Sequence, residues 1–335
     1  MKNMEVTRIE DKEHRQKEDP YMNVLDEWVT HYRSFTSEGR CASYIPVLEK
    51  ADPSHLGICI IGPDGTMMKS GNWDVVFTLQ SISKVISFIA VCLHHDISYV
   101  LDRVDLEPTG DPFNSIVRLE MHKPGKPFNP MINAGAITVS SLLPGVSTKE
   151  KLESLCELME KMVGKRPTFN EEVFQSEWQT AYRNRALAYY LKETGYLEIE
   201  VEQALEVYLK QCSLEVNTED IALIGLILAH DGYHPIRKEQ ILPKKIARLA
   251  KSLMLTCGVY NASGKFAAFI GLPAKSGVSG GIMATVPPRV RMEELPFING
   301  CGIGIYGPAI DEFGTSVAGA MLLKQLANSW DLSIF

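Results

Sequence analysis

The chain has 335 residues, of which 45% are hydrophobic, and a formal net charge of −7 at pH 7. This length suits one large domain or two intertwined ones. The net negative charge does not indicate the excess of basic residues that is typical of nucleic-acid-binding proteins. No stretch approaches the roughly 18 consecutive apolar residues of a membrane helix, and the charged N-terminus does not look like a secretory signal. We therefore expect a cytoplasmic protein that binds neither nucleic acid nor a membrane.

The seven cysteines are odd in number, widely spaced and mostly flanked by apolar residues. Buried free thiols in a reducing compartment explain this pattern better than disulfides do. The eight histidines show no metal-ligand spacing, and the chain has no phosphate loop or dinucleotide fingerprint. The sequence therefore predicts no metal and no cofactor.

The N-terminal part begins with a charged flexible tail over residues 1–20. An amphipathic helix is expected over 22–36, followed by a β-hairpin over 55–71. The apolar run of this hairpin stops at the tetrapeptide Gly-Pro-Asp-Gly, which is strong turn chemistry. The N-terminal part therefore contributes at least two strands to a sheet.

The middle of the chain, about 81–230, has mostly helical periodicity. One helix is expected to start at Ser147, a good N-cap residue, and to stop at Gly164. Another starts at Thr218, with acidic residues in its first turn that favour the helix dipole, and stops at Gly232.

The composition changes again after this helical block. The glycine-punctuated runs 264–287 and 300–308 are typical of strands, and a last helix is expected over 316–330. Strands from both ends of the chain suggest one sheet with a helical insertion between them. We therefore predict an α/β sheet domain made of 21–80 plus 235–335, and a mainly helical subdomain over 81–234.

Ser81 and Lys84 form a Ser-x-x-Lys pair inside an otherwise apolar segment. On a helix, residues three apart share a face, with about 5–6 Å between their Cβ atoms. Burial lowers the pKa of a lysine, and a neutral amine could take the serine proton and create a nucleophile. The pair could equally be a helix-start serine beside a lysine that reaches solvent, because this short motif is a weak signal.

A second motif, Lys275-Ser276-Gly277, lies in a strand-like stretch near the C-terminus. In serine enzymes of the penicillin-recognising group, a Lys-Thr/Ser-Gly strand faces the Ser-x-x-Lys helix. An N–H on such a strand can complete an oxyanion hole with the N–H of the serine. Alone, the motif could be a turn with an exposed lysine. Together, the two motifs favour a serine acyl-transfer site.

Six segments extend these motifs into a resemblance to a known family. In chain order they are "TLQSISKV", "NPMINAGAI", "YRNRALAYYLK", "YLKQCS", "TCGVYNASG" and "AKSGVSGGI". Their order and spacing resemble the bacterial type of the serine-dependent glutaminase family, whose members hydrolyse L-glutamine to L-glutamate and ammonia. The resemblance implies an α/β (α+β) fold: a β-lactamase-like antiparallel sheet flanked by helices, with an inserted all-helical subdomain.

The resemblance also implies the roles of individual residues. Ser81 matches the nucleophile, Lys84 its general base, and Tyr260 a tyrosine beside the serine. The backbone N–H of Val278 matches the second oxyanion donor. The implied substrate-binding residues are Tyr44, Gln80, Asn133, Glu177, Asn184, Tyr208, Tyr260 and Val278.

The chemistry of a free amino acid agrees with these roles. Glu177 could hold the substrate ammonium by a charge-assisted bond, and Asn133, Asn184 and Tyr208 could hold its carboxylate with neutral donors. Each could instead be a turn residue, an exposed helix position or a core aromatic with a satisfied hydroxyl. On one straight helix, Glu177 and Asn184 would lie about 10 Å apart along the axis. We therefore expect a helix to begin between them, with Glu177 in a loop or first turn.

The sequence thus predicts a glutaminase, an amidohydrolase that acts on L-glutamine through a Ser81 acyl-enzyme. A β-lactamase or D,D-peptidase remains an alternative, since "YRN" supplies the Tyr-x-Asn of such enzymes, although their substrates lie outside the cytoplasm. A non-catalytic amino-acid-binding protein is another, although binding alone needs neither Ser81 nor Lys84. The family resemblance further suggests a homodimer or homotetramer.

Overall fold

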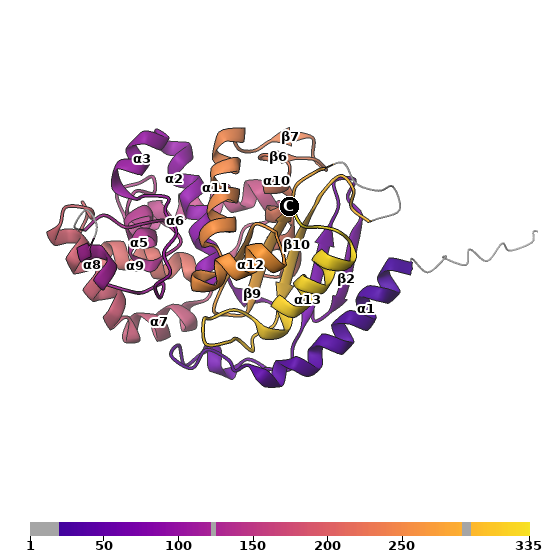
Figure 1. Ribbon diagram of the computed structural model, residues 1–335. Helices are drawn as coiled ribbons and strands as arrows, with labels where there is room; N and C mark the ends of the chain where they lie inside the picture. Colours follow the sequence, from indigo (N-terminus) through magenta and orange to yellow (C-terminus); the bar gives the residue numbers. More distant parts are fainter. Residues whose placement is uncertain (1–19, 122–124, 290–295) are drawn as a thin grey trace, which may run out of the picture.

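The computed structural model describes residues 20–121, 125–289 and 296–335. The tail predicted over 1–20 lies outside this part, except for its last residue. A sheet occupies one side of the molecule and a group of helices the other (Figure 1). This arrangement confirms the expected mixed fold of an antiparallel sheet flanked by helices.

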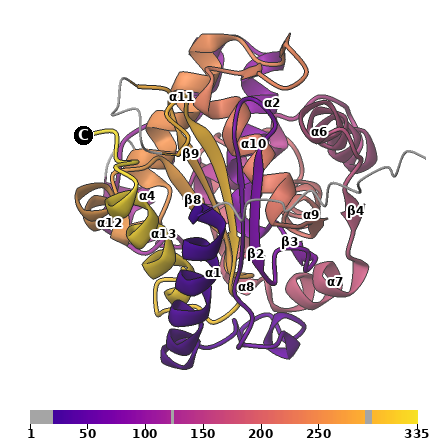
Figure 2. The ribbon, with the colours of Figure 1, turned by 90° about the vertical axis from the view of Figure 1, so that its right-hand side faces the viewer.

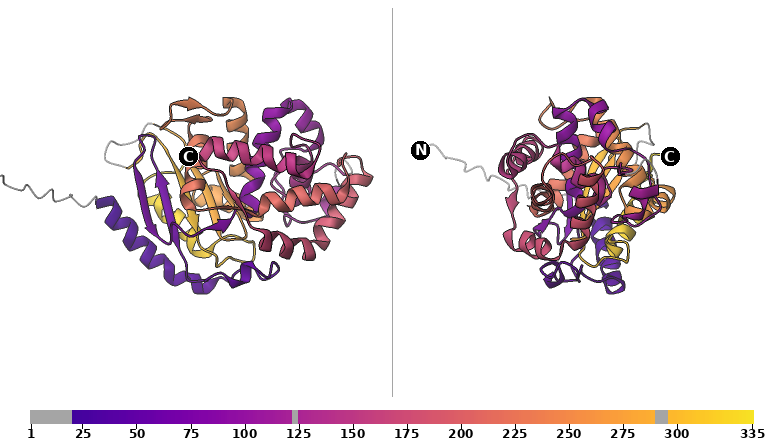
Figure 3. Two further views of the ribbon diagram at one scale, coloured as in Figure 1. Left: turned by 180° about the vertical axis from the view of Figure 1, so that it is seen from behind. Right: turned by 90° about the vertical axis from the view of Figure 1, so that its left-hand side faces the viewer.

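The main sheet is built from both ends of the chain. Its strands are β1 (Gly57–Ile61), β2 (Met67–Gly71), β8 (Ala274–Ser276), β9 (Gly281–Val286) and β10 (Cys301–Tyr306). They lie in the order β2-β1-β10-β9-β8, and every neighbouring pair is antiparallel. The predicted hairpin is the β1–β2 pair, and β1 also pairs along its whole length with β10. In the left view of Figure 3, the purple strands of the N-terminal part lie beside the strands of the C-terminal part.

The two faces of the sheet are covered by different helices. Successive strand residues point to opposite faces, so Ile58 and Ile60 of β1 join the cluster formed with α1 (Pro20–Arg33) and α13 (Val317–Ser329). Figure 2 shows these two helices side by side. On the opposite face, Cys59 and Ile61 pack against α10 (Thr218–Ala229).

Glycines in β10 allow α10 to lie directly on the sheet. A Cβ atom at Gly302 would lie 1.8 Å from the Ala222 carbonyl oxygen, and one at Gly304 would lie 1.9 Å from the Thr218 oxygen. Gly225 forms the matching surface on the helix, its Cβ position 2.4 Å from a β9 carbonyl oxygen. The glycines of β10 are therefore required for α10 to lie this close to the sheet.

The helices on the other side include α2, which is buried from its first residue to Cys92 and packs against α3, α5 and α6. They are α2 (Ser83–His94), α3 (Ile97–Arg103), α4 (Val117–Met121), α5 (Asn133–Ser141), α6 (Thr148–Val163), α7 (Glu171–Thr180), α8 (Tyr182–Glu193) and α9 (Val201–Cys212). The expected ends of α6 are confirmed: Ser147 forms a capping box with Glu150, and Gly164 takes φ 86°. Helix α10 likewise begins at the predicted Thr218.

The strand prediction for 264–287 is wrong at its start. Residues Ser263–Phe269 form helix α12, because Phe266 and Ile270, four residues apart, both pack into the core beside the sheet. Periodicity also missed several strands, which are too short for a two-residue alternation to register. They are β3 (Phe77–Thr78), β4 (Thr168–Phe169), β5 (Leu214–Val216), β6 (Tyr233–His234) and β7 (Glu239–Gln240).

The remaining long helix, α11 (Lys244–Cys257), packs against α2 and α12 and so joins the helical side to the sheet side. Helix α10 belongs in sequence to the predicted subdomain 81–234, yet it lies on the sheet. The exact division of the chain into two units stays a prediction. All seven cysteines lie in the described ranges, where none of them forms a disulfide and six are buried. In the same ranges, no helix is both long and apolar enough to cross a membrane.

Candidate active site

A cavity of about 210 Å³ brings most of the predicted site residues together. Those that line it are Tyr44, Gln80, Ser81, Asn133, Glu177, Asn184, Tyr208 and Val278. The other two, Lys84 and Tyr260, are buried and hydrogen-bonded to the lining residues Asn133 and Ser81. Residues far apart in the sequence thus converge on one site.

Ser81 lies in a 3₁₀ turn, Gln80–Ile82, that runs directly into α2. Gln80 holds φ 46°, a left-handed conformation that costs a non-glycine residue about 1–3 kcal/mol and is typical of functional sites. Gly277, at the end of β8, lies against this turn: a Cβ atom there would be 2.7 Å from the Leu79 oxygen. The Lys-Ser-Gly strand therefore approaches the serine closely, as expected.

Lys84 is fully buried and finds its partners on another element. Its Nζ donates to Asn133 Oδ1 at 2.7 Å and to the Met131 oxygen at 3.2 Å. Burial lowers its pKa to about 8, although Cys212 and Glu177 act in the opposite direction. The alternative of a lysine that reaches solvent is therefore wrong, because its side chain is 0% exposed.

Tyr260 begins a second 3₁₀ turn, Tyr260–Ala262, and also has a positive φ, 52°. Its hydroxyl donates to the Ser276 oxygen at 3.2 Å and is hydrogen-bonded to the Ser81 hydroxyl. Burial raises the pKa of Tyr260 to about 12, against the effect of these two bonds. The phenol is thus neutral and in direct contact with the proposed nucleophile.

Lys275 is a second fully buried lysine at the site. Its Nζ donates to the Ser276 oxygen at 2.6 Å and lies 4.4 Å from the centre of the Tyr260 ring. Burial, together with the positive charge of Lys84, lowers its pKa well below the usual range. The alternative of an exposed lysine in a turn is wrong here as well.

Glu177 presents an unpaired carboxylate oxygen. The Gln80 side chain is hydrogen-bonded to this carboxyl group, but Oε2 is buried and has no hydrogen-bond partner among the described residues. Burial raises the pKa of Glu177 to about 7, against the effects of Gln80 and of the nearby Lys84. An unpartnered acid at a cavity wall is suited to a ligand cation.

A chain of amides connects Lys84 to the cavity wall. Asn133 accepts from Lys84 through Oδ1 and donates through Nδ2 to Asn184 Oδ1 at 2.9 Å. The expected helix break is confirmed, because α7 ends at Thr180 and α8 begins at Tyr182. The placement of Glu177 in a loop or first turn is wrong, since it lies in the second half of α7.

Sequence reasoning missed part of the cavity lining. The additional residues are Ile45, Phe113, Asn114, Thr180, Ala181 and Arg183. Arg183 precedes Asn184, and its Nε donates to the Asn114 oxygen at 3.0 Å, so adjacency to a recognised motif could have identified it. Phe113 reaches the site because its oxygen accepts from the Asn133 N–H at 2.8 Å, a long-range contact without a local signal.

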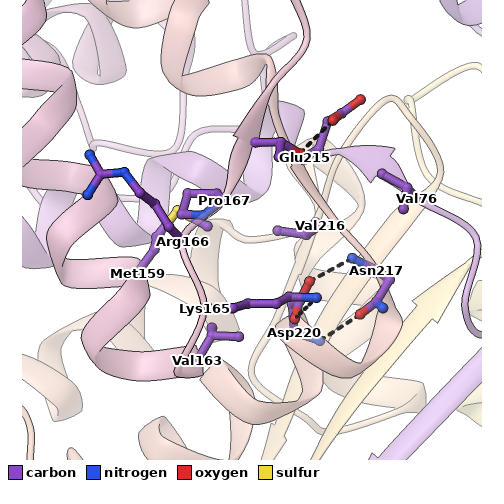
Figure 4. Close-up of a pocket in the computed structure, with 11 residues that line it drawn as sticks. Val76, Met159, Val163, Lys165, Arg166, Pro167, Glu215, Val216, Asn217 and Asp220 are labelled. Atoms are coloured by element: carbon purple, nitrogen blue, oxygen red, sulfur yellow. Dashed lines mark hydrogen bonds and ion pairs between the residues drawn. The ribbon is translucent and has the colours of Figure 1, made fainter.

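A second cavity, of about 140 Å³, lies beside β5 and α6 (Figure 4). Its charged side chains already have protein partners: Lys165 lies 2.9 Å from Asp220, which also caps α10. Arg166 pairs with Glu160 at 3.4 Å, and Glu215 accepts from Thr168 and Asn170. No group of His, Cys, Asp or Glu among the described residues is arranged to hold a metal ion. The reactive groups therefore belong to the cavity at Ser81.

Comparison with known proteins points to one family. The family model described as Glutaminase matches residues 39–335. Glutaminase 2 of Bacillus cereus is 74% identical over 311 residues, which cover 93% of this chain and 95% of that protein. A crystal structure of a probable glutaminase from Bacillus subtilis, 66% identical, superposes with a TM-score of 0.89 over 94% of this chain and 98% of that one.

A further solved structure bears on the chemistry. It is the Bacillus subtilis glutaminase in a covalent complex with 5-oxo-L-norleucine, formed by reaction with 6-diazo-5-oxo-L-norleucine. That protein is 63% identical, with a TM-score of 0.86 over 94% of this chain and 100% of that one. This relative therefore reacts covalently with 6-diazo-5-oxo-L-norleucine.

Proposed function

The chain belongs to the glutaminase family, and we propose that it hydrolyses L-glutamine to L-glutamate and ammonia through an ester on Ser81. It is therefore an amidohydrolase, and the β-lactamase and binding-protein alternatives are set aside by the family match. The observation that carries the proposed route is the buried Lys84, which follows Ser81 by one turn at a cavity with an unpaired carboxylate.

Acylation requires Ser81 to lose its proton. With a pKa of about 8, roughly one Lys84 amine in ten is neutral at pH 7. In our proposal this amine accepts the proton as Ser81 Oγ attacks the side-chain amide carbon. The N–H groups of Ser81 and Val278 then stabilise the oxyanion, an interaction that strengthens as charge develops.

The leaving group must be protonated before the C–N bond breaks. Tyr260 is hydrogen-bonded to Ser81, so its phenol can pass a proton to the departing nitrogen and recover one from Lys84. Ammonia then leaves, and a water molecule attacks the glutamyl ester with Lys84 again acting as the base. The second step restores Ser81 and releases glutamate.

Contacts of the site with the α-ammonium and α-carboxylate groups of the substrate favour free glutamine over a glutamine side chain within a peptide. Glu177 offers its unpaired Oε2 to the substrate ammonium. Asn184 and Tyr208 hold the carboxylate, and Tyr44 and Gln80 line the remaining wall. In this proposal Asn133 lines the substrate cavity and also positions Lys84, because its amide connects Lys84 to Asn184.

Ammonia release from L-glutamine by wild type and by Ser81→Ala tests this route. The variant should lose turnover by several orders of magnitude, since it lacks the nucleophile. Binding of L-glutamate, measured by calorimetry, should persist because the head-group side chains are intact. Wild-type turnover in the variant would rule the ester out, and rapid nitrocefin hydrolysis by the wild type would reopen the β-lactamase alternative.

Assembly and location are also proposals. We expect a homodimer or homotetramer in the cytoplasm, in line with the family resemblance. The seven free thiols support a reducing compartment. Light scattering coupled to size exclusion would measure the mass, and a single-chain mass at micromolar concentration would contradict the assembly.

A further inference from the structure

A buried polar group lies just beneath the site and takes part in none of the steps above. Gln211, near the end of α9, accepts from Ser140 Oγ of α5 at 3.1 Å through Oε1. Its Nε2 donates to Ser87 Oγ of α2 at 3.4 Å. All three side chains are 0% exposed. One amide thus joins three helices, and these three residues are called the Gln211 brace below.

The same three helices carry the residues of the proposed mechanism. Ser87 follows Lys84 by three residues on α2, and its Oγ donates to the Lys84 oxygen at 3.3 Å. On α9, Gln211 follows Tyr208 by three residues, a spacing that keeps both on one helix face. On α5, Ser140 follows Asn133 by seven residues, or two turns. The brace therefore lies one to two turns deeper on the faces that present the site.

Stability alone does not require this amide. Burying an amide is unfavourable unless its hydrogen bonds are made, and an apolar side chain of similar size would need none. Ser87 does not need it either, because its hydroxyl donates to the Lys84 oxygen. The single hydroxyl proton of Ser140 is shared between Gln211 Oε1 at 3.1 Å and the Ala136 oxygen at 2.6 Å. Where helices meet only through apolar side chains, small shifts of one helix against another cost little free energy. Directed hydrogen bonds between the helices favour a single relative placement.

We propose that Gln211 is a positioning residue that fixes α2, α5 and α9 relative to one another, so that the Lys84 amine meets the Asn133 amide. That contact, 2.7 Å long, crosses from α2 to α5. Misplacement of a reacting group by about 1 Å can lower a rate by about 10²-fold. The inference rests on the proposed roles of Lys84 and Asn133.

Loss of the brace should also change the pKa of Lys84. The Asn133 oxygen accepts from Lys84 and so favours the charged amine. When the two helices shift apart, this stabilisation weakens and the amine titrates at a lower pH. A variant that is only less stable lowers the amount of folded enzyme and leaves the titration unchanged.

Gln211→Met tests the proposal, because methionine has a similar size and no hydrogen-bonding amide. We expect a thermal midpoint within a few degrees of wild type, a kcat lower by about ten- to a hundredfold, and a smaller change in KM. The acidic limb of the kcat profile should move to lower pH. The matched control is Ser141→Ala, one residue along α5, whose hydroxyl donates to the Thr138 oxygen of its own helix at 2.7 Å. This control should keep the wild-type kcat and profile.

A folded Gln211→Met variant with wild-type kcat and pH profile would overturn the proposal. If that variant does not fold, Ser140→Ala removes the contact with Gln211 together with one hydrogen bond inside α5. It should still lower kcat several-fold and shift the limb, and an unchanged profile there overturns the proposal too. Ser140→Ala added to Gln211→Met should cost little more, because both act through one contact. Lys84→Ala, assayed in parallel, distinguishes failure of the proposed function from failure of the brace. Wild-type kcat in Lys84→Ala refutes the proposed function, whereas a strongly lowered kcat there beside wild-type kcat in Gln211→Met refutes only the brace.

Discussion

In the proposed route, two buried ionisable side chains, Lys84 and Glu177, make activity depend on pH in the same direction. Lys84 must be neutral to act as a base, and Glu177 must be ionised to hold an ammonium. Burial brings the pKa of Lys84 down to about 8 and that of Glu177 up to about 7. At the residue scale, we therefore expect the site to lose function as the pH falls. Protonation of Lys84 and protonation of Glu177 both occur within one or two pH units of neutrality.

We predict that kcat/KM rises from pH 6 to pH 9. The rise through about 7 follows ionisation of Glu177, and the rise through about 8 follows deprotonation of Lys84. Ammonia release measured across this range checks the prediction. Lys84→Ala should lower kcat by about 10²–10⁴-fold and remove the limb near 8. A flat or falling profile in the wild type would contradict these assignments.

Glu177→Ala should raise KM for L-glutamine, with a smaller effect on kcat. The variant removes the carboxylate offered to the substrate ammonium, which is distant from the amide that reacts. The discriminating comparison uses N-α-acetyl-glutamine, which has no ammonium. The variant should process this analogue no worse than wild type does, and an equal loss for both substrates would refute the head-group role.

At the scale of elements, the contact between α10 and β10 depends on strand glycines. Any side chain at Gly302 would meet the Ala222 carbonyl oxygen, which belongs to the helix backbone and cannot rotate away. This contact decides how near the helix lies to the sheet. It also explains why a strand that reads as loosely packed in sequence is fully buried.

We predict that Gly302→Ala lowers the free energy of unfolding by about 3 kcal/mol, because the added methyl group forces helix and sheet apart. The matched control is Gly264→Ala on α12, where an added Cβ meets no atom within 4 Å. It should stabilise the protein by about 0.5 kcal/mol, as expected for alanine in a helix. Denaturant titration measures both. Equal stability of the two variants would contradict the close approach.

Elements with strong local signals were predictable from the sequence. The hairpin at 55–71 has a continuous apolar run that stops at turn residues, and α6 has Ser147 and Gly164 at its ends. Helix α12 was not predictable by composition, because glycines on both sides masked its short period. The strands of two or three residues exist only through long-range pairing, as when β3 pairs with β5.

The candidate site was predictable where the family motifs cover it. Ser81 lines the cavity and is hydrogen-bonded to Tyr260, and Lys84 binds Asn133 at the cavity wall, while the catalytic roles that the resemblance implied stay predictions. Phe113 and Asn114 come from an irregular segment that reaches the cavity through tertiary contacts, so no sequence pattern marks them. The partner of Lys84 was also hidden, because an Asn133 amide that accepts from a lysine looks in sequence like any helix-start residue.

At the scale of the whole molecule, the cavity collects side chains from segments that span most of the chain. Tyr44 and Ser81 come from the N-terminal third, Glu177 from the helical middle, and Val278 from the C-terminal sheet. Neither the sheet nor the helices alone complete the site. Local unfolding of either part should therefore abolish activity and binding together.

A chain shortened to residues 1–299 lacks β10, which lies between β1 and β9 in the sheet. We predict that it does not form the native sheet and has no glutaminase activity, because β1 and β9 lose their common neighbour. Near-ultraviolet circular dichroism and ammonia release check this. A native-like spectrum with turnover in the shortened chain would contradict it.

The pairing of β1 with β10 also determines when the sheet can form during translation. A ribosome makes Gly57–Ile61 well before its partner strand, Cys301–Tyr306. Strand pairing over so long a separation is slow and leaves the unpaired strand edges exposed to aggregation in the meantime. The sheet therefore cannot form before β10 has been synthesised, and until then the nascent polypeptide has to be protected from aggregation.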